Sequence, residues 1–292
     1  MSRNPPSTPL FAQHPRNWRE NTYIYPVLSR RSKGLSVGIN LNTDKSCNFN
    51  CVYCCVDRSN VVCRAQTDLG VLRQELDDML ELVKNGNIWR MPPFDQTPPE
   101  LRRFNDVAFS GDGEPTASAV FGPACRVAAE LLARHHFPNA KIVLITNATL
   151  LDRPSVQETL QLLDRSNGEI WAKLDAGNEE QYRRIVRSPI PFQHVLDNIA
   201  LVGRGRDIVI QSMFLAFDGQ PPSPEDLADY VRQLRNLSAG GCRIRLVQAY
   251  TIARPVFQTH IAPLTHAQLD HIVSLVQHDG LAAEAYYAGI AE

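Results

Sequence analysis

The chain has 292 residues, of which 43% are hydrophobic and 21% are charged, an ordinary composition for a globular protein with one large domain or two smaller ones. The formal net charge of −1 predicts no global positive field of the kind that nucleic-acid binders carry. No run of about 18 apolar residues predicts a transmembrane helix, and residues 1–20 lack the apolar core of a secretory signal. We therefore expect a cytoplasmic protein without a membrane partner.

Apolar periodicity predicts strands and helices that alternate along the chain. Residues 1–32, rich in Pro, Asn and Arg, are expected to form an irregular N-terminal extension. A strand over 35–41 then leads into a cysteine-rich segment, and a helix over 69–85 ends at Asn85-Gly86. Further strands are expected at 106–110, 141–146, 169–174, 207–214 and 243–249, and further helices at 120–136, 154–166, 179–187, 193–203, 223–237 and 265–278.

Six strands alternating with helices imply right-handed βαβ units and a parallel sheet, the α/β class. The polar motifs described below all follow a strand at its carboxyl end, where barrel active sites are built. This placement favours a partial (β/α)6 parallel barrel over an open doubly wound sheet. We expect a single barrel domain over residues 33–280 and a C-terminal tail over 281–292.

The cysteines are crowded, because Cys47, Cys51, Cys54 and Cys55 lie within nine residues. An odd count of seven in a large chain without a signal disfavours a disulfide scaffold and favours metal binding. Cys47, Cys51 and Cys54 have the spacing C-x3-C-x2-C, which lets three thiolates bind three of the four irons of a cuboidal cluster. The fourth iron is then left for a small molecule that chelates through an amine and a carboxylate.

A zinc site is the alternative interpretation of this loop. Structural zinc takes four ligands, usually from two paired knuckles, and only Cys51 and Cys54 form a C-x2-C knuckle. Cys55 or Cys63 could complete such a site, so a non-catalytic zinc-binding module stays open. Cys125 and Cys242 are expected to be buried as small hydrophobic residues.

A glycine-rich turn, Gly111-Asp112-Gly113-Glu114, follows the second predicted strand. Its glycines let a ligand approach the backbone closely, and Glu114 is an acceptor that suits a protonated amine. Such a turn is common by itself, but this one follows the cysteine loop by about sixty residues and comes directly after a strand.

Polar residues also close the next three predicted strands. Thr146 and Asn147 follow the third strand, Lys173 and Asp175 the fourth, and Gln211 lies on the fifth. Lys173 and Asp175 point to the same side of their strand. If that side is the barrel interior, the two charges must pair with each other or with Glu114, or bind a ligand.

The cysteine spacing, with the aromatic Tyr53 directly before Cys54, resembles the signature of the radical S-adenosylmethionine (SAM) superfamily. The resemblance implies a [4Fe–4S] cluster on Cys47, Cys51 and Cys54 whose open iron binds the amine and carboxylate of SAM. An electron from a reduced donor of the flavodoxin or ferredoxin type then cleaves SAM to methionine and a 5′-deoxyadenosyl radical. That radical abstracts hydrogen from a substrate. The resemblance implies SAM contacts by Tyr53, Gly111, Asp112, Gly113, Glu114, Thr146, Asn147, Lys173, Asp175 and Gln211.

The segment 25–57, together with FSGDGEPT and ITNATL, resembles the branch of this superfamily that includes wyosine-base tRNA synthases. The likeness implies a tRNA base or a small molecule as substrate. Most basic groups of the chain are interpreted as solvated surface charges, and the pair Arg30 and Arg31 is the one to test for contact with an anionic substrate. Members of that branch carry a second cluster on N-terminal cysteines, whereas no cysteine precedes Cys47 here. A glycyl-radical-enzyme activase, which acts on a protein, is the alternative enzyme class.

Overall fold

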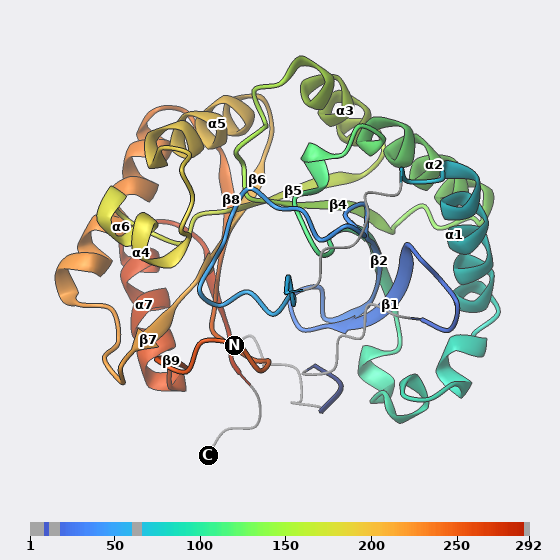
Figure 1. Cartoon of the computed structure of the whole chain (residues 1–292), viewed down its shortest axis with the longest axis horizontal. Coiled ribbons are helices and arrows are strands. Elements are labelled where there is room, and N and C mark those ends of the chain that lie inside the picture. Colours follow the sequence, from blue (N-terminus) through green and yellow to red (C-terminus); the bar gives the residue numbers. More distant parts are fainter. Residues whose placement is uncertain (1–8, 12–17, 60–65, 289–292) are drawn as a thin grey trace. The chain divides into compact units, whose positions relative to one another are not determined.

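The computed structural model describes residues 9–11, 18–59 and 66–288 (Figure 1). Cys63 lies outside the described residues. The chain forms two compact units, the first from residues 1–46, 58–144 and 154–169 and the second from residues 47–57, 145–153 and 170–292. The single barrel domain expected over 33–280 stays a prediction.

The sheet of the first unit begins with a hairpin and continues with parallel strands. Strand β1 (Ile24–Ser29) pairs antiparallel with β2 (Gly34–Ile39). Strand β2 then pairs parallel with β3 (Phe104–Phe109), and β3 with β4 (Lys141–Thr146). Every residue of β2 is buried, so this strand forms the centre of the core of the unit.

Three helices, α1 (Leu69–Lys84), α2 (Phe121–Arg134) and α3 (Pro154–Asp164), lie along these strands in the first unit (Figure 1). Helix α1 begins where the Asp68 carboxylate accepts hydrogen bonds from the backbone N–H groups of residues 70 and 71, a standard N-cap. Its buried face consists of Leu72, Leu76, Met79, Leu80 and Val83. One-turn 3-10 helices lie at Pro9–Phe11, Asn87–Arg90, Phe94–Gln96, Pro99–Leu101 and Pro115–Ala117.

The second unit contains four parallel neighbours, β5 (Gly168–Lys173, whose last four residues belong to this unit), β6 (Ile208–Met213), β8 (Ile244–Tyr250) and β10 (Ala283–Tyr286). Two short strands, β7 (Leu215–Phe217) and β9 (Ile261–Pro263), pair antiparallel in a separate sheet.

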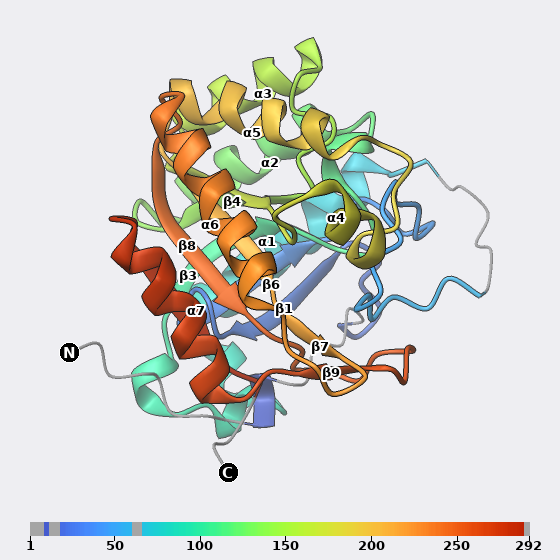
Figure 2. The ribbon, with the colours of Figure 1, turned by 90° about the vertical axis from the view of Figure 1, so that its left-hand side faces the viewer.

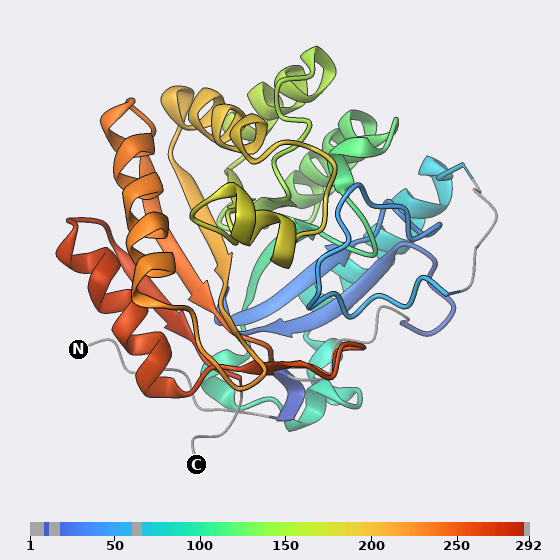
Figure 3. The same ribbon diagram turned by 60° about the vertical axis from the view of Figure 1, so that its left-hand side comes forward.

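The helices of the second unit are α4 (Glu179–Ile185), α5 (Phe192–Gly205), α6 (Pro224–Ala239) and α7 (His266–His278). Figures 2 and 3 show α6 and α7 side by side along the same strands. Both helices begin with a capping box, which satisfies two backbone donors at each start. No helix in the described residues is both long enough and apolar enough to cross a membrane.

The six strands and seven helices expected from periodicity are all present, and each observed end lies within two residues of the predicted one. Two expectations about the chain ends are wrong. Residues 24–29, expected within the irregular extension, form β1, and residues 283–286, expected within the tail, form β10. Pro26 argues against a strand from sequence, but a proline fits an edge strand, and β1 and β10 are the two outermost strands in the strand order.

Candidate active site

The three cysteines of the C-x3-C-x2-C motif lie on one loop of the second unit. All three are half-buried, and none of them forms a disulfide. The loop is tied to the end of helix α4, because the backbone N–H groups of Asn50 and Val52 donate to the carbonyls of Val186 (3.1 Å) and Ile185 (2.9 Å). A turn from Cys51 O to Cys54 N (3.0 Å) then brings the last cysteine back toward the middle one. The loop therefore has a defined path between its first and last thiols.

Polar side chains hold the first half of this loop. Asn48 Nδ2 donates to Thr149 Oγ1 (2.6 Å), and Asn48 Oδ1 accepts from Asn147 Nδ2 (2.6 Å). Asn147 in turn contacts Thr149, because Asn147 Oδ1 accepts from the backbone N–H and the hydroxyl of Thr149 (3.1 and 2.7 Å). The turn that follows β4 thus positions the loop next to Cys47.

The second half of the loop is held by apolar packing and by charge. Val52 and Tyr53 pack in a buried cluster completed by Met213, Leu215, Tyr250, Ile252, Ile261 and Tyr286. The Tyr53 hydroxyl donates to Asp175 Oδ2 and accepts from Lys173 Nζ, which lies 2.5 Å away. Lys173 Nζ also lies 3.7 Å from Asp175 Oδ2. The two charges at the end of β5 therefore pair with each other through a residue of the cysteine loop.

Burial changes the acidity of this region. It raises the pKa of the Cys51 thiol to about 12, against an opposing effect of Lys173, and Asp175 raises it further. Burial and the nearby Asp175 likewise raise the pKa of Tyr53 well above its ordinary value. The Cys51 thiol is therefore protonated in the metal-free protein, and iron binding at Cys51 must displace that proton.

The glycine-rich turn lies in the first unit, where Asn40 fixes it. Asn40 Nδ2 donates to Asp112 Oδ2 (2.7 Å), and Asn40 Oδ1 accepts from the backbone N–H of Asp112 (3.1 Å). A Cβ atom on Gly111 would lie 2.3 Å from Asn40 Oδ1, and one on Gly113 would lie 1.9 Å from the carbonyl oxygen of Ser46. Only glycine allows this close approach to the backbone just before Cys47.

Glu114 is buried at the end of this turn. Its Oε1 accepts from the backbone N–H (3.1 Å) and the hydroxyl (2.6 Å) of Thr116 and so caps the 3-10 helix Pro115–Ala117. Arg58 supports the turn from another segment of the same unit, because it donates to the carbonyls of Asp112 (2.9 Å) and Lys45 (3.0 Å).

The remaining predicted residues lie in the second unit. Thr146 is buried and its hydroxyl accepts from the backbone N–H of Ala148 (3.0 Å). Gln211 is in register with Lys173 on β5 and with Gln248 on β8, so the three side chains form a row on one face of the sheet. Gln211 Nε2 donates to Gln248 Oε1 (2.9 Å), whereas Gln211 Oε1 is buried without a hydrogen-bond partner. That acceptor fits a ligand that brings a donor.

The structure thus gathers Tyr53, Lys173 and Asp175 at the cysteine loop, with Asn147 on its other side and Gln211 beside Lys173. Gly111, Asp112, Gly113 and Glu114 form their own turn in the first unit. Sequence reasoning missed four supporting residues, Asn40, Asn48, Arg58 and Thr149. The available signal was a polar residue in the turn that follows a strand, with Asn40 directly after β2 and Thr149 three residues after β4, but such a residue does not indicate its partner.

The thiol donor set fits an iron–sulfur cluster. No group of three His, Cys, Asp or Glu side chains in the described part of the chain is gathered closely enough to hold a single metal ion. A [4Fe–4S] cluster does not require such convergence, because each of its three thiolates binds a different iron. The expectation that Cys125 and Cys242 are buried is confirmed, with 0% and 4% exposure.

Comparisons with known proteins agree with this geometry. The family described as the radical SAM superfamily matches residues 41–231. UPF0026 protein slr1464 of Synechocystis sp. is 29% identical over 185 residues, a match that spans 60% of this chain and 57% of that relative. This chain thus matches little more than half of the length of the relative.

Two solved structures resemble the chain. TYW1 with a lysine-pyruvate adduct bound is 15% identical with a TM-score of 0.54, over 83% of this chain and 73% of that one. A radical SAM methyltransferase from Sphaerobacter thermophilus is 14% identical with a TM-score of 0.59, over 87% and 66%. At these identities the likeness concerns the fold alone, and it confirms the expected partial parallel α/β barrel.

The matched family covers well over half of the sequence and includes the cysteine loop, the glycine-rich turn and the ends of β4, β5 and β6. The chain therefore belongs to the radical SAM superfamily, whose enzymes use a [4Fe–4S] cluster and S-adenosylmethionine.

Proposed function

We propose that this protein reductively cleaves SAM and uses the resulting 5′-deoxyadenosyl radical to abstract hydrogen from a tRNA base or a small molecule. The observation that carries the proposal is the single loop that presents three half-buried cysteines, none in a disulfide, at C-x3-C-x2-C spacing. In this proposal Cys47, Cys51 and Cys54 each bind one iron. The bound cluster supplies the electron and the open iron that the chemistry needs.

The chain's own residues would bind and orient SAM. The backbone of Gly111, Asp112 and Gly113 would let SAM approach closely. The Glu114 carboxylate, which the Thr116 hydroxyl already orients, would accept a hydrogen bond from the SAM amine. The buried free acceptor of Gln211 suits a ribose hydroxyl. Thr146, Asn147, Tyr53, Lys173 and Asp175 complete the proposed contact set.

The electron has to come from a partner. A reduced donor of the flavodoxin or ferredoxin type supplies one electron at low potential, and we place the reaction in the cytoplasm, where such donors are kept reduced. The half-buried cysteine loop supports this route, because it leaves part of the thiol surface accessible from outside.

The experiment is anaerobic reconstitution with iron and sulfide, followed by metal analysis, absorbance before and after dithionite, and an assay for 5′-deoxyadenosine. Cys54→Ala should lose the cluster and all SAM cleavage. Cys55→Ala is the matched control, because it removes the adjacent thiol and should keep both. Iron-free wild-type protein after reconstitution, or equal behaviour of the two variants, would overturn the proposal.

The substrate class needs its own test. Arg30 and Arg31 lie in the tight turn between β1 and β2. If the substrate is tRNA, bulk tRNA should shift the wild-type protein in a native gel, and a variant with both arginines changed to Ser should shift at least tenfold less. A shift that is unchanged in the variant would remove these residues from substrate binding.

A further inference from the structure

A small charged group at the end of β5 contacts the cysteine loop and is almost fully buried. The side chain of Asp175 is 1% exposed and that of Lys173 is 19% exposed. Asp175 uses both oxygens, since Oδ1 accepts from the backbone N–H of Met213 (2.8 Å) and Oδ2 from the Tyr53 hydroxyl. Asp175 thus ties the cysteine loop to strand β6.

Lys173 makes weaker charge-compensating contacts than Asp175 does. Its short hydrogen bond goes to the neutral phenol of Tyr53, while the carboxylate of Asp175 is 3.7 Å away, beyond hydrogen-bond distance. Its ammonium also lies 4.7 Å from the centre of the Tyr53 ring. An ammonium in such a site is costly unless negative charge compensates it. The Asp175 carboxylate, at 3.7 Å, compensates the charge of the ammonium only in part, so additional negative charge nearby would stabilise the ammonium.

The residue that Lys173 contacts belongs to the cysteine loop itself, because Tyr53 lies between Cys51 and Cys54 in the sequence. The Lys173 ammonium lies 4.7 Å from the centre of the Tyr53 ring, whereas Asp175 is held at the terminal hydroxyl of Tyr53 and at the backbone N–H of Met213 on β6. The positive end of the pair therefore lies along the side chain that leads to the iron ligands.

We infer that Lys173 raises the reduction potential of the cluster bound to the loop, and that Asp175 and Tyr53 are positioning residues that hold Lys173 against the loop. The inference rests on the proposed function, in that Cys47, Cys51 and Cys54 hold the cluster. On reduction, one electron from a low-potential donor enters the cluster, no covalent bond forms or breaks, and no proton needs to move. The added negative charge is stabilised by the nearby ammonium, because net charge and local electrostatics set cluster potentials.

The test compares charge-changing variants that act in opposite directions. Lys173→Met should make reduction harder by at least tenfold in the equilibrium constant, about 59 mV for a one-electron couple. Lys173→Arg keeps the charge and should stay near the wild-type potential. Asp175→Asn removes the opposing charge and should shift the potential upward. The potential is measured by EPR-monitored redox titration of anaerobically reconstituted protein without SAM.

A matched charge pair lies at the other end of the same strands. Arg243 and Asp207, 3.0 Å apart and 55% and 62% exposed, precede β8 and β6. Asp207 is four residues from Gln211, about 13 Å at the rise of a strand, which exceeds the screening length of about 8 Å at physiological salt. Arg243→Met and Asp207→Asn should therefore leave the potential unchanged.

Iron and sulfide content is measured first in every sample. Wild-type protein that binds no cluster would defeat the proposed function, whereas the inference fails separately if clusters are intact and Lys173→Met titrates like the wild type. Downward shifts in both Lys173→Met and Asp175→Asn would also overturn the inference, because a purely structural role predicts the same direction for both. If Lys173→Met does not retain its cluster, the sign of the shift in Asp175→Asn decides alone.

Discussion

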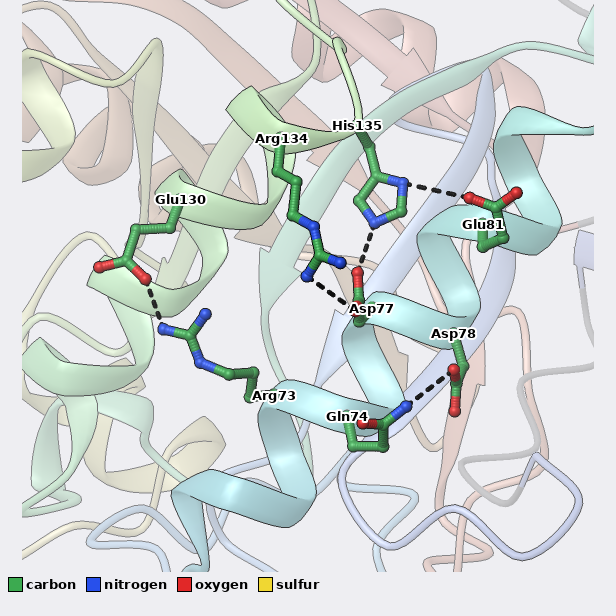
Figure 4. Close-up of polar contacts among 8 residues, drawn as sticks. All are labelled: Arg73, Gln74, Asp77, Asp78, Glu81, Glu130, Arg134 and His135. Atoms are coloured by element: carbon green, nitrogen blue, oxygen red, sulfur yellow. Dashed lines mark hydrogen bonds and ion pairs between the residues drawn. The ribbon is translucent and has the colours of Figure 1, made fainter.

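Nε2 of His135, at the end of α2, lies 2.5 Å from Oδ1 of Asp77 on α1 (Figure 4). The other oxygen of Asp77 accepts from Arg134 Nη1 (3.0 Å), and His135 Nδ1 is 3.6 Å from Glu81 Oε2. His135 is only 7% exposed, so Asp77 supplies the hydrogen-bond partner that this buried imidazole needs. These contacts join the first two helices of the first unit on their polar sides.

We expect Asp77→Asn to lower the free energy of unfolding of the iron-free protein by about 1–3 kcal/mol at pH 7, the cost of leaving the buried His135 imidazole poorly satisfied. The hydrogen bond from His135, and after it the charge of Arg134, hold the pKa of Asp77 below its ordinary value. A lowered pKa stabilises the fold above the unfolded-state pKa and is lost as the pH falls through the folded one. The difference between wild type and variant should therefore shrink below about pH 4.

Urea denaturation followed by circular dichroism measures this difference. Glu130→Gln is the control, because it breaks the pair with Arg73 on the same two helices, where the side chains are 46% and 58% exposed. An exposed pair is worth about 1 kcal/mol at most. Equal losses in the two variants would contradict a special role for the buried pair.

The buried carboxyl of Asp106 should give the opposite pH dependence of the free energy of unfolding. It is 3% exposed between β2 and β4, and burial raises its pKa to about 6 although Ser36 donates a hydrogen bond to it. A raised carboxyl pKa means that stability is complete below the unfolded value of 3.8 and falls as the pH rises to about 6. The loss is about 3 kcal/mol at most.

Asp106→Asn keeps an oxygen for Ser36 and removes the ionisation. The stability of this variant relative to wild type should therefore rise between about pH 4 and 6 and then level off. Denaturation midpoints across this range test the prediction, with Asp207→Asn as an exposed control that should show no such rise. If the difference in stability between Asp106→Asn and wild type is the same at every pH, burial of the Asp106 charge is not the cause of that difference.

Periodicity was enough to predict the strands and helices whose faces are buried in the regular way. Strand β1 was missed because Pro26 removes a donor, and this is tolerated only because β1 is an outermost strand. Strand β10 was missed because its sequence, AEAY, has two alanines and a glutamate, which are depleted in strands, and only four residues.

The site was predictable where its residues belong to a local motif or share a strand. The expectation that Lys173 and Asp175 lie on one side of their strand is confirmed by their ion pair. The partners of the loop were not predictable, because Asn48 and Thr149 are 101 residues apart and Asn40 and Asp112 are 72 apart. Such contacts follow from the packing of whole strands, which a single sequence does not specify.

Gly113→Ala should disrupt the backbone next to the cysteine loop. The added Cβ would lie 1.9 Å from the Ser46 carbonyl and 2.8 Å from Asn42 Cβ, so backbone atoms have to move. Overpacking of this kind costs about 1–3 kcal/mol, and we expect SAM affinity to fall at least tenfold. Gly205→Ala, where no atom lies within 4 Å of the new Cβ, is the control and should lose neither stability nor affinity. Thermal unfolding and anaerobic calorimetry measure the two quantities, and similar values for both variants would show that the turn can relax.

Glu114→Gln should separate the charge of this residue from its capping role. A glutamine oxygen still accepts from the N–H and hydroxyl of Thr116, so the 3-10 helix Pro115–Ala117 keeps its cap. The variant lacks the negative charge that the proposed SAM amine requires, and a charge-assisted hydrogen bond is worth about 1.5–3 kcal/mol. Calorimetry on reconstituted protein should therefore show SAM binding at least tenfold weaker, with iron content and unfolding temperature unchanged. Thr116→Val removes one donor to Glu114 and leaves its charge, so it should bind SAM more tightly than Glu114→Gln does. If Glu114→Gln binds SAM as the wild type does, the amine is held elsewhere and the buried carboxylate serves only to cap the turn.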